Sequence, residues 1–306
     1  MRLITRLDFD GVACGTILKE MGVADKFFFA HPKDIQDGLI AASSDDILAN
    51  LPYLEGCGMW FDHHKAEIKR VADMKATVKG AAKAAPSAAR VVYEYYGGRS
   101  ALPNLELMIY YVDKVDSGRL SIAEISKPSG WALLGFILDP KTGLGQAREF
   151  EKSPAAFAER IIEACRSMSI DEIMDIPDVV ERVAFYNEQA EKFAGMIEKH
   201  TKTDGNAIIT DLRGQKTIYA GNRFMVYGMY PKQNVALWIT DGRDNDHTNI
   251  SAGYSVVNRS LEVDISDIMS HVGGVGHEFA AACTVPTEAA ESVIADITRK
   301  IKREGE

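Results

Sequence analysis

Two short apolar runs near the N-terminus each end in a cluster of acidic or histidine residues, and this pattern constrains the fold more than any other. Residues 3–7 (LITRL) lead into residues 8–11 (DFDG), and residues 58–61 (GMWF) lead into residues 62–64 (DHH). Each apolar run has the length and composition of a buried β-strand. Because strand ends in an open α/β sheet face the crevice where such folds bind ligands, we expect both clusters at one ligand site.

The two clusters carry the donor atoms of a metal site. Asp8 and Asp10 are separated by one residue, so on an extended segment their side chains point the same way and can share an ion. Asp62, His63 and His64 add a carboxylate and two imidazoles. This mixed set suits Mn²⁺, Mg²⁺ or Fe²⁺ and metal-assisted attack of water on phosphorus. Either motif alone is more often a solvated turn or a helix N-cap, but the two together favour the metal site.

The order of apolar segments predicts two domains. From residue 1 to about 120, strand-like and helix-like segments alternate, which is typical of a parallel α/β sheet. Residues 155–200 are helical by pattern, and a polar cluster follows at 201–205. We therefore predict an α/β fold with an N-terminal parallel-sheet domain over residues 1–200, a smaller C-terminal α/β domain over residues 205–306, and a cleft between them.

Individual elements follow from the same pattern. We expect helices over residues 12–20, from residue 88 to the glycines at 97 and 98, and over 179–200, and strands over 27–30 (a buried strand), 46–50, 207–210, 224–227 and 235–239. The apolar stretch 105–115 is interpreted as a strand that ends near Asp113 and Asp116. Residues 278–282 are helix-like and follow a glycine-rich turn.

Composition excludes several classes of protein. The net charge of −9 and the pI near 5.4 give no basic footprint for duplex DNA. The four cysteines are scattered without C-x-x-C spacing, which disfavours a disulfide framework or a zinc ribbon. Charged residues interrupt the N-terminal apolar run, and no segment approaches the length of a transmembrane helix. We expect a cytoplasmic protein with reduced thiols and no membrane partner.

The motifs, taken in order, resemble those of the DHH phosphoesterase superfamily with its associated C-terminal domain. The matching runs are Asp8–Gly11, Asp62–His64, Asp116-Ser117, Asn258–Ser260 and Gly273–Ala281. Three further stretches are similar to the group labelled exopolyphosphatase-related: Asn50–Tyr53, Trp60–His64 and Leu134–Pro140. The resemblance extends over nearly the whole chain and implies a two-domain clamp that holds catalytic metals, usually Mn²⁺ with Mg²⁺ as the alternative.

The resemblance also implies roles for single residues. Asp8 would serve a first metal, and Asp10 and His63 a second one. His64 would contact the scissile phosphate, and Asp62 would orient one of the two histidines or ligate directly. Asp116 matches the remaining ligand of the second metal, because a serine follows it, and Asp113 is the alternative. A helix N-cap is the structural alternative for either aspartate.

In the C-terminal part, the resemblance implies a phosphate-binding strand and a glycine-rich turn. The residues expected to hold the distal part of the substrate are Asn258, Arg259, Gly273, Gly274, Gly276 and His277. Glycine-rich turns can bring backbone N–H groups close to an anion. Taken alone, such a turn is more often only a tight connection, and His277 is nearly as often a core histidine.

The chain departs from the pattern of the family in two respects. Arg6 and Ile4 stand where relatives commonly carry a histidine, and Asn50 stands where an aspartate usually bridges the two metals. An amide oxygen can bind Mg²⁺ but carries no charge, so Asn50 would bridge two cations poorly. Arg6 either replaces the first metal as a fixed positive charge on phosphate oxygens or forms a salt bridge with Asp8 or Asp62. We favour the first reading slightly.

These observations predict a metal-dependent phosphoesterase that acts on a small phosphorylated or nucleotide-like substrate. The group label implies polyphosphate, while short oligonucleotides, cyclic dinucleotides and phosphoadenosine phosphate remain open because one scaffold hosts many substrates. The alternative is a metal-poor regulatory protein that binds phosphate or nucleotide ligands and has kept the clamp. A processive single-strand nuclease is disfavoured by the acidic charge. A homodimer is compatible with either reading.

Overall fold

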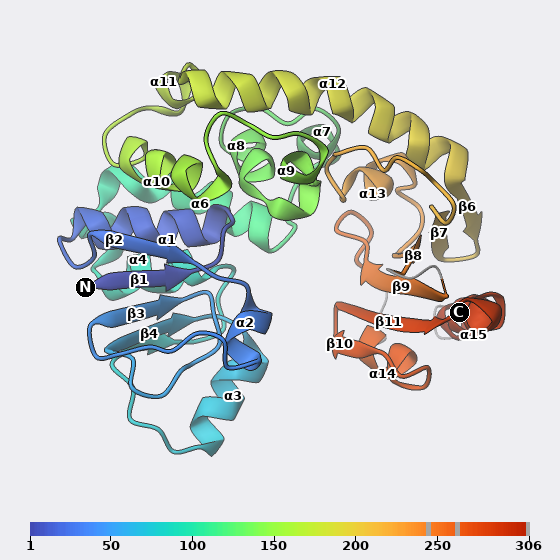
Figure 1. The fold of residues 1–306 in the computed structure, drawn as a ribbon, viewed down its shortest axis with the longest axis horizontal. Helices are drawn as coiled ribbons and strands as arrows, with labels where there is room; N and C mark the ends of the chain where they lie inside the picture. Colours follow the sequence, from blue (N-terminus) through green and yellow to red (C-terminus); the bar gives the residue numbers. More distant parts are fainter. Residues whose placement is uncertain (243–245, 261–263, 304–306) are drawn as a thin grey trace. The chain divides into compact units, whose positions relative to one another are not determined.

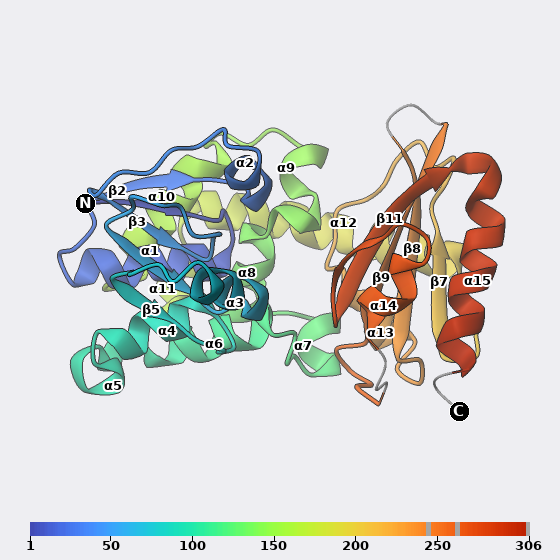
Figure 2. The same cartoon turned by 90° about the horizontal axis from the view of Figure 1, so that it is seen from below.

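The computed structural model describes residues 1–242, 246–260 and 264–303, except for the side chains of His277 and Arg303. The chain forms two compact units (Figures 1 and 2). Unit 1 comprises Met1–Arg119 and Pro128–Tyr186, and unit 2 comprises Leu120–Lys127 and Asn187–Glu306. The division falls within the long helix α12 (Pro177–His200), whereas the sequence predicted a boundary just after this helix.

Unit 1 is built on a five-stranded parallel sheet, as the sequence predicted. The strands lie in the order β2-β1-β3-β4-β5. Their bounds are β1 Arg2–Thr5, β2 Lys26–Phe29, β3 Asp46–Ala49, β4 Met59–Asp62 and β5 Gly80–Ala82. Thr5 pairs with Ala49, which in turn pairs with Phe61. The carboxyl ends of β1, β3 and β4 therefore lie side by side, and they carry the residues of the predicted site.

Helices cover both faces of this sheet, which explains its apolar central strands. Helices α4 (Ala88–Tyr95) and α10 (Pro154–Ala164) both pack against α1 (Phe9–Glu20) beside the sheet (Figure 1). On the opposite face, Ile4, Leu48 and Trp60 form a core cluster. This cluster receives Ile35 from α2 (Pro32–Gln36) and Val71 from α3 (Lys65–Asp73). The edge strand β2 was predicted as buried, but its side chains alternate between half-buried and exposed.

The stretch interpreted as a strand at 105–115 is instead the helix α6 (Glu106–Asp116). Leu105, Met108, Ile109 and Val112 are buried and follow the i, i+3, i+4, i+7 spacing of one helix face. The remaining helices of unit 1 are α5 (Gly98–Ala101), α8 (Gly130–Leu138), α9 (Leu144–Ala147) and α11 (Ile170–Met174). In the described part of the chain, no helix combines the length and the apolar character needed to span a bilayer.

Unit 2 contains a six-stranded mixed sheet in the order β10-β11-β9-β8-β7-β6. The strands are β6 Thr201–Asp204, β7 Ala207–Asp211, β8 Val235–Asp241, β9 His247–Tyr254, β10 Val275–His277 and β11 Ala280–Pro286. Among the described strands of this sheet, only β7 and β8 pair in parallel. Helices α14 (Ile265–Ser270) and α15 (Ala290–Arg303) contribute Ile268, Ile297 and Ile301 to the core on one face of this sheet. The short helix α7 (Ile122–Ser126) also belongs to this unit.

Three element predictions in unit 2 were wrong. Residues 224–227 open helix α13 (Met225–Met229), because the side-chain oxygen of Asn222 accepts from the Phe224 N–H and turns the chain there. The helix-like stretch 278–282 is a turn followed by β11. Alternate side chains of β11, among them Ala281 and Cys283, point into the core. Arg259 was placed on a strand, yet β9 ends at Tyr254 and a loop follows.

Candidate active site

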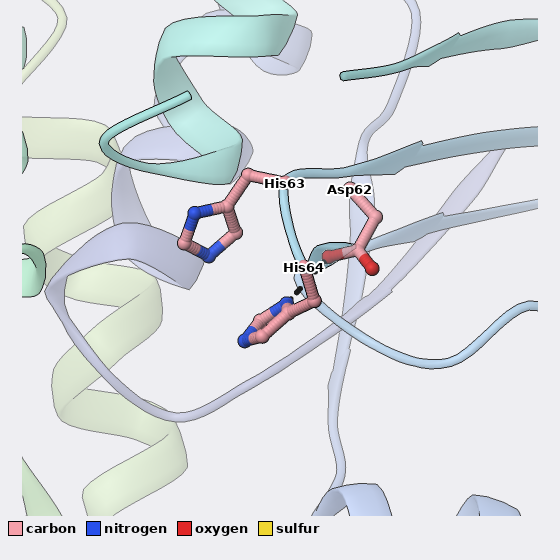
Figure 3. A group of neighbouring side chains, drawn as sticks. All are labelled: Asp62, His63 and His64. Atoms are coloured by element: carbon pink, nitrogen blue, oxygen red, sulfur yellow. Dashed lines mark hydrogen bonds and ion pairs between the residues drawn. The ribbon is translucent and has the colours of Figure 1, made fainter. Parts of the chain in front are cut away.

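The predicted site residues lie at the carboxyl edge of the parallel sheet in unit 1. Asp8 is the N-cap of α1 on the short connection after β1, and its carboxylate accepts from the Gly11 N–H at 2.9 Å. Asp10 lies in the first turn of α1. Asp62 ends β4, and the two histidines follow it on the connection to α3 (Figure 3). The sequence prediction that both clusters share one edge of the sheet is borne out by this arrangement.

Asp10 is held by the N-terminus of a neighbouring helix. Its side chain is 2% exposed, and its two oxygens accept from the N–H groups of Ala88 at 2.9 Å and Ala89 at 2.7 Å, the first residues of α4. Burial and the charges of Asp116 and Asp8 raise the pKa of Asp10 well above its ordinary value, against the effect of these two hydrogen bonds. The two hydrogen bonds thus fix the orientation of the Asp10 carboxylate, and a nearby cation would stabilise its charged form.

His63 presents an unpartnered nitrogen to two carboxylates. Its Nδ1 lies 3.1 Å from the carbonyl oxygen of Ala85, which can only accept, so Nδ1 donates there and, in the neutral ring, Nε2 carries a lone pair. Nε2 is buried and has no hydrogen-bond partner among the described residues. It lies 3.5 Å from Asp116 Oδ2 and 3.9 Å from Asp10 Oδ2. A lone pair facing two carboxylates is unfavourable unless a proton or a metal ion lies between them.

Asp10, His63 and Asp116 therefore form a group that fits a divalent cation. Burial, the largest effect, raises the pKa of Asp116. His63 lowers this pKa and Asp8 raises it, and the net shift is upward. Two carboxylates and one imidazole, with open positions left for water, suit Mn²⁺ or Mg²⁺. Asp116 is the last residue of α6 rather than of a strand, and its Oδ2 lies 3.5 Å from His63 Nε2. Its role as a metal ligand stays a prediction.

The alternative ligand, Asp113, is engaged elsewhere. Its carboxylate accepts from Arg90 Nε at 2.9 Å, from Arg90 Nη2 at 2.6 Å and from the Ser87 hydroxyl at 2.7 Å. Ser87 also caps α4, whose first N–H groups hold Asp10. Asp113 thus stabilises the N-terminal end of α4, which in turn orients the candidate metal ligand Asp10. The Pro-Ser start of α4 was visible in the sequence, but its role in holding Asp10 was missed.

Asp62 and His64 form a second pair beside this group. Asp62 is fully buried, and its Oδ1 accepts from His64 Nδ1 at 2.8 Å (Figure 3). Burial lowers the pKa of His64, but the hydrogen bond and the charge of Asp62 together raise it by more, so the net shift is upward. The His64 side chain is 43% exposed. With Nδ1 turned to Asp62, the ring can offer Nε2 to a ligand.

Asp8 is tied to two neighbours instead of joining the metal group. Its Oδ2 lies 3.1 Å from Arg6 Nε, and its Oδ1 accepts from Asn50 Nδ2 at 3.3 Å. Burial lowers the pKa of Arg6, but Asp8, Asp116 and further carboxylates raise it more, so the guanidinium stays charged. Asn50 directly follows β3 in a left-handed conformation with φ of 57°. Asn50 Oδ1 and Asp62 Oδ2 are buried acceptors without a hydrogen-bond partner in the described part.

The predicted residues of the C-terminal part lie in unit 2. Asn258 donates through Nδ2 to the Lys232 carbonyl at 2.7 Å, and Arg259 is exposed in the same loop. Gly273 has a φ of 75°. A Cβ at Gly274 would lie 2.7 Å from the Met269 carbonyl oxygen.

Gly276 is equally confined, because a Cβ there would lie 2.4 Å from the Ala280 carbonyl oxygen. Close backbone packing at Gly274 and Gly276 and the left-handed φ at Gly273 thus account for these glycines. Their role in anion binding stays a prediction. The side chain of His277 lies outside the described residues.

One solved structure decides the family. The chain is 36% identical to a pGpG-specific phosphodiesterase, PggH from Vibrio cholerae, over 99% of both chains with a TM-score of 0.87. The chain belongs to the DHH phosphoesterase superfamily. The resemblance inferred from the motifs and the predicted fold class are both confirmed. As a DHH protein of this kind, the chain is a phosphohydrolase.

More distant solved structures share the fold. A DHH domain from a protein described as a member of a family of ribosomal proteins is 12% identical, with a TM-score of 0.54 over 100% of this chain and 87% of that one. CDC45 from Entamoeba histolytica is 7% identical, with a TM-score of 0.52 over 98% and 95% of the two chains. No family model and no curated protein sequence matches the chain.

Proposed function

We propose that this DHH protein is a metal-dependent phosphodiesterase that hydrolyses a short linear oligonucleotide, of which the dinucleotide pGpG is the first to test. The observation that carries this proposal is the identity of 36% over 99% of both chains to a pGpG-specific phosphodiesterase. The Asp10–His63–Asp116 group also supports the proposal, because these three side chains could hold the divalent ion that such hydrolysis needs. Polyphosphate, implied by the exopolyphosphatase-related resemblance, stays a prediction without support from these relatives.

The candidate ligands of the cation are Asp10, His63 and Asp116. A divalent ion bound there, Mn²⁺ by our proposal, lowers the pKa of bound water and neutralises charge on the phosphoryl group. The residues supply orientation. The α4 N–H groups fix the Asp10 carboxylate, and the Ala85 carbonyl fixes the His63 tautomer, so the donor atoms are set before any ligand arrives.

His64 would act on the substrate itself. Because Asp62 accepts from Nδ1, the ring is held in one orientation, and Nε2 can donate to a phosphoryl oxygen when it is protonated. The buried Asp62 carboxylate stabilises that protonated form. The Asp62–His64 pair therefore positions a hydrogen bond that strengthens as charge develops on phosphorus.

The alternative, a metal-poor regulatory protein, draws on one observation: Asp8 is paired with Arg6 and Asn50 and stands outside the metal group. The Asp10–His63–Asp116 group nevertheless keeps two carboxylates and a correctly oriented imidazole. Loss of a first cation would thus change the number of ions without removing the candidate catalytic one.

The test is a substrate panel with chelator-stripped protein, with and without added Mn²⁺. The panel contains pGpG, pApA, a longer single strand, a cyclic dinucleotide and tripolyphosphate, and release of mononucleotide or phosphate is followed by chromatography. We expect Mn²⁺-dependent release of GMP from pGpG, and its loss in Asp10→Asn. Arg99→Gln serves as the matched control, since this side chain is 78% exposed. Turnover of tripolyphosphate alone would refute the proposal.

A further inference from the structure

We propose that Arg6 is a built-in cation of the active site, which binds a non-bridging phosphate oxygen of the substrate, and that the pocket therefore takes one divalent ion per chain. This inference rests on the proposed function, because it assigns the phosphate-binding group of that same site. It also makes a separate claim, the number of ions, that can be measured without any turnover.

The first argument is that three donors already engage the Asp8 carboxylate. Oδ2 is paired with Arg6 Nε, and Oδ1 accepts from both the Gly11 N–H and Asn50 Nδ2. A cation at Asp8 would be limited to the remaining lone pair of Oδ2, where it would lie against the guanidinium. Metal ions and hydrogen-bond donors compete for the same lone pairs, so this carboxylate is a poor site for a second ion.

The second argument concerns the group that would have to bridge two ions. Two divalent cations in one site lie about 3.5–4 Å apart and repel each other. Asn50, which contacts Asp8, offers only a neutral amide oxygen as a bridge. Asp62 accepts from His64 through Oδ1, which leaves only its Oδ2 without a hydrogen-bond partner among the described residues. The fixed charge of Arg6 adds further repulsion against a second cation. These electrostatic terms favour one ion and one guanidinium.

The third argument is the placement of Arg6. Its Nε lies 3.1 Å from Asp8 Oδ2. Burial lowers the pKa of Arg6, but the charges of Asp8, Asp116 and Asp10 raise it by more, so the guanidinium keeps its charge. The Arg6 side chain is 23% exposed. The remaining N–H groups form a planar fork that matches two phosphate oxygens.

The ion count is tested by calorimetric titration of Mn²⁺ into chelator-stripped protein, together with Mn²⁺ electron paramagnetic resonance. We expect one ion and an uncoupled spectrum for the wild type. The double variant Arg6→His/Asn50→Asp removes the guanidinium and supplies two ligands. Aspartate tolerates the left-handed backbone at this position. This variant should bind two ions and show a spin-coupled spectrum. Two ions in the wild type would overturn the proposal, whether or not the double variant folds.

The phosphate contact is tested by binding of the product GMP in the presence of Mg²⁺. Arg6→Gln should keep one metal ion but weaken GMP binding by about 10-fold or more, the size of a lost charge-assisted hydrogen bond. Arg6→Lys should recover part of this loss, and Arg99→Gln, as the control, should bind GMP like the wild type. Unchanged GMP affinity in Arg6→Gln would refute the contact. Inactivity toward pGpG with these binding results intact would refute only the proposed substrate.

Discussion

Replacing Asp113 and Asp116 separately should produce opposite effects, although the two carboxylates are three residues apart on α6. Asp116 has an upward-shifted pKa because burial and Asp8 disfavour its charge, so Asp116→Asn removes a charge that the metal-free fold tolerates poorly. We expect its metal-free unfolding free energy to stay unchanged or to rise. Asp113→Asn breaks the paired contacts from Arg90 and should cost about 1.5–3 kcal/mol.

Metal binding reverses the ranking of the two variants. At a Mn²⁺ concentration about 100 times the dissociation constant, binding stabilises the wild type by about 2.7 kcal/mol. For a unit of this size, that corresponds to a rise in melting temperature of about 5–10 °C. Loss of the Asp116 carboxylate should weaken binding at least 100-fold, since even groups behind the ligands contribute about 10–100-fold. The stabilisation at the same Mn²⁺ concentration would then be about 0.4 kcal/mol, or roughly 1 °C.

Thermal melting of both variants, with EDTA and with Mn²⁺, checks this reasoning. Asp113→Asn should melt lower than the wild type in EDTA but keep most of the Mn²⁺-induced rise. Asp116→Asn should match or exceed the wild type in EDTA and lose that rise. A full Mn²⁺ response in Asp116→Asn, together with a lost one in Asp113→Asn, would mean that Asp113 is the ligand and that the geometry has been misread.

Three further changes test how the fold builds the site. Gly11→Ala would place a Cβ 2.0 Å from the Arg6 carbonyl oxygen, so urea unfolding should show a loss of about 1–3 kcal/mol; an unchanged midpoint would contradict this. Asp46→Asn removes the partner of Arg2. Burial raises the pKa of Asp46, but hydrogen bonds from Arg2 and a nearby serine lower it below its ordinary value. The stabilisation is therefore present above about pH 4 and is lost as the pH falls through the lowered pKa of Asp46. The wild type should be more stable than the variant by about 1–2 kcal/mol at pH 7, and this difference in unfolding free energy should shrink in acid. A difference independent of pH would speak against the ion pair. Gly276→Ala brings a Cβ against the backbone of β11 and should lower the unfolding free energy by about 1–3 kcal/mol in the same urea assay. Unaltered stability would mean that packing does not explain this glycine and would favour the predicted role in anion binding.

The elements that the sequence predicted well are those with a strong local signal. The strands that lead into Asp8 and Asp62, the helix that opens there and the long helix α12 all have uninterrupted periodicity or clear end signals. The errors arose where a short apolar segment fits both periods. Residues 105–116 and 224–227 are apolar enough for a strand, and only packing against their neighbours selects the helix.

The order and spacing of residues were enough to predict the parallel sheet of unit 1 and the strand ends at which the candidate site lies. Strand ends and side-chain identities are local properties, so they can be derived from order and spacing alone. The tertiary structure decided which carboxylate joins which partner. Asp116 meets His63 while Asp113 braces α4, and Asp8 is bound to Arg6 and Asn50. These pairings depend on distances between segments far apart in the chain, and those distances are set by the packing of α1, α4 and α6 rather than by any local pattern.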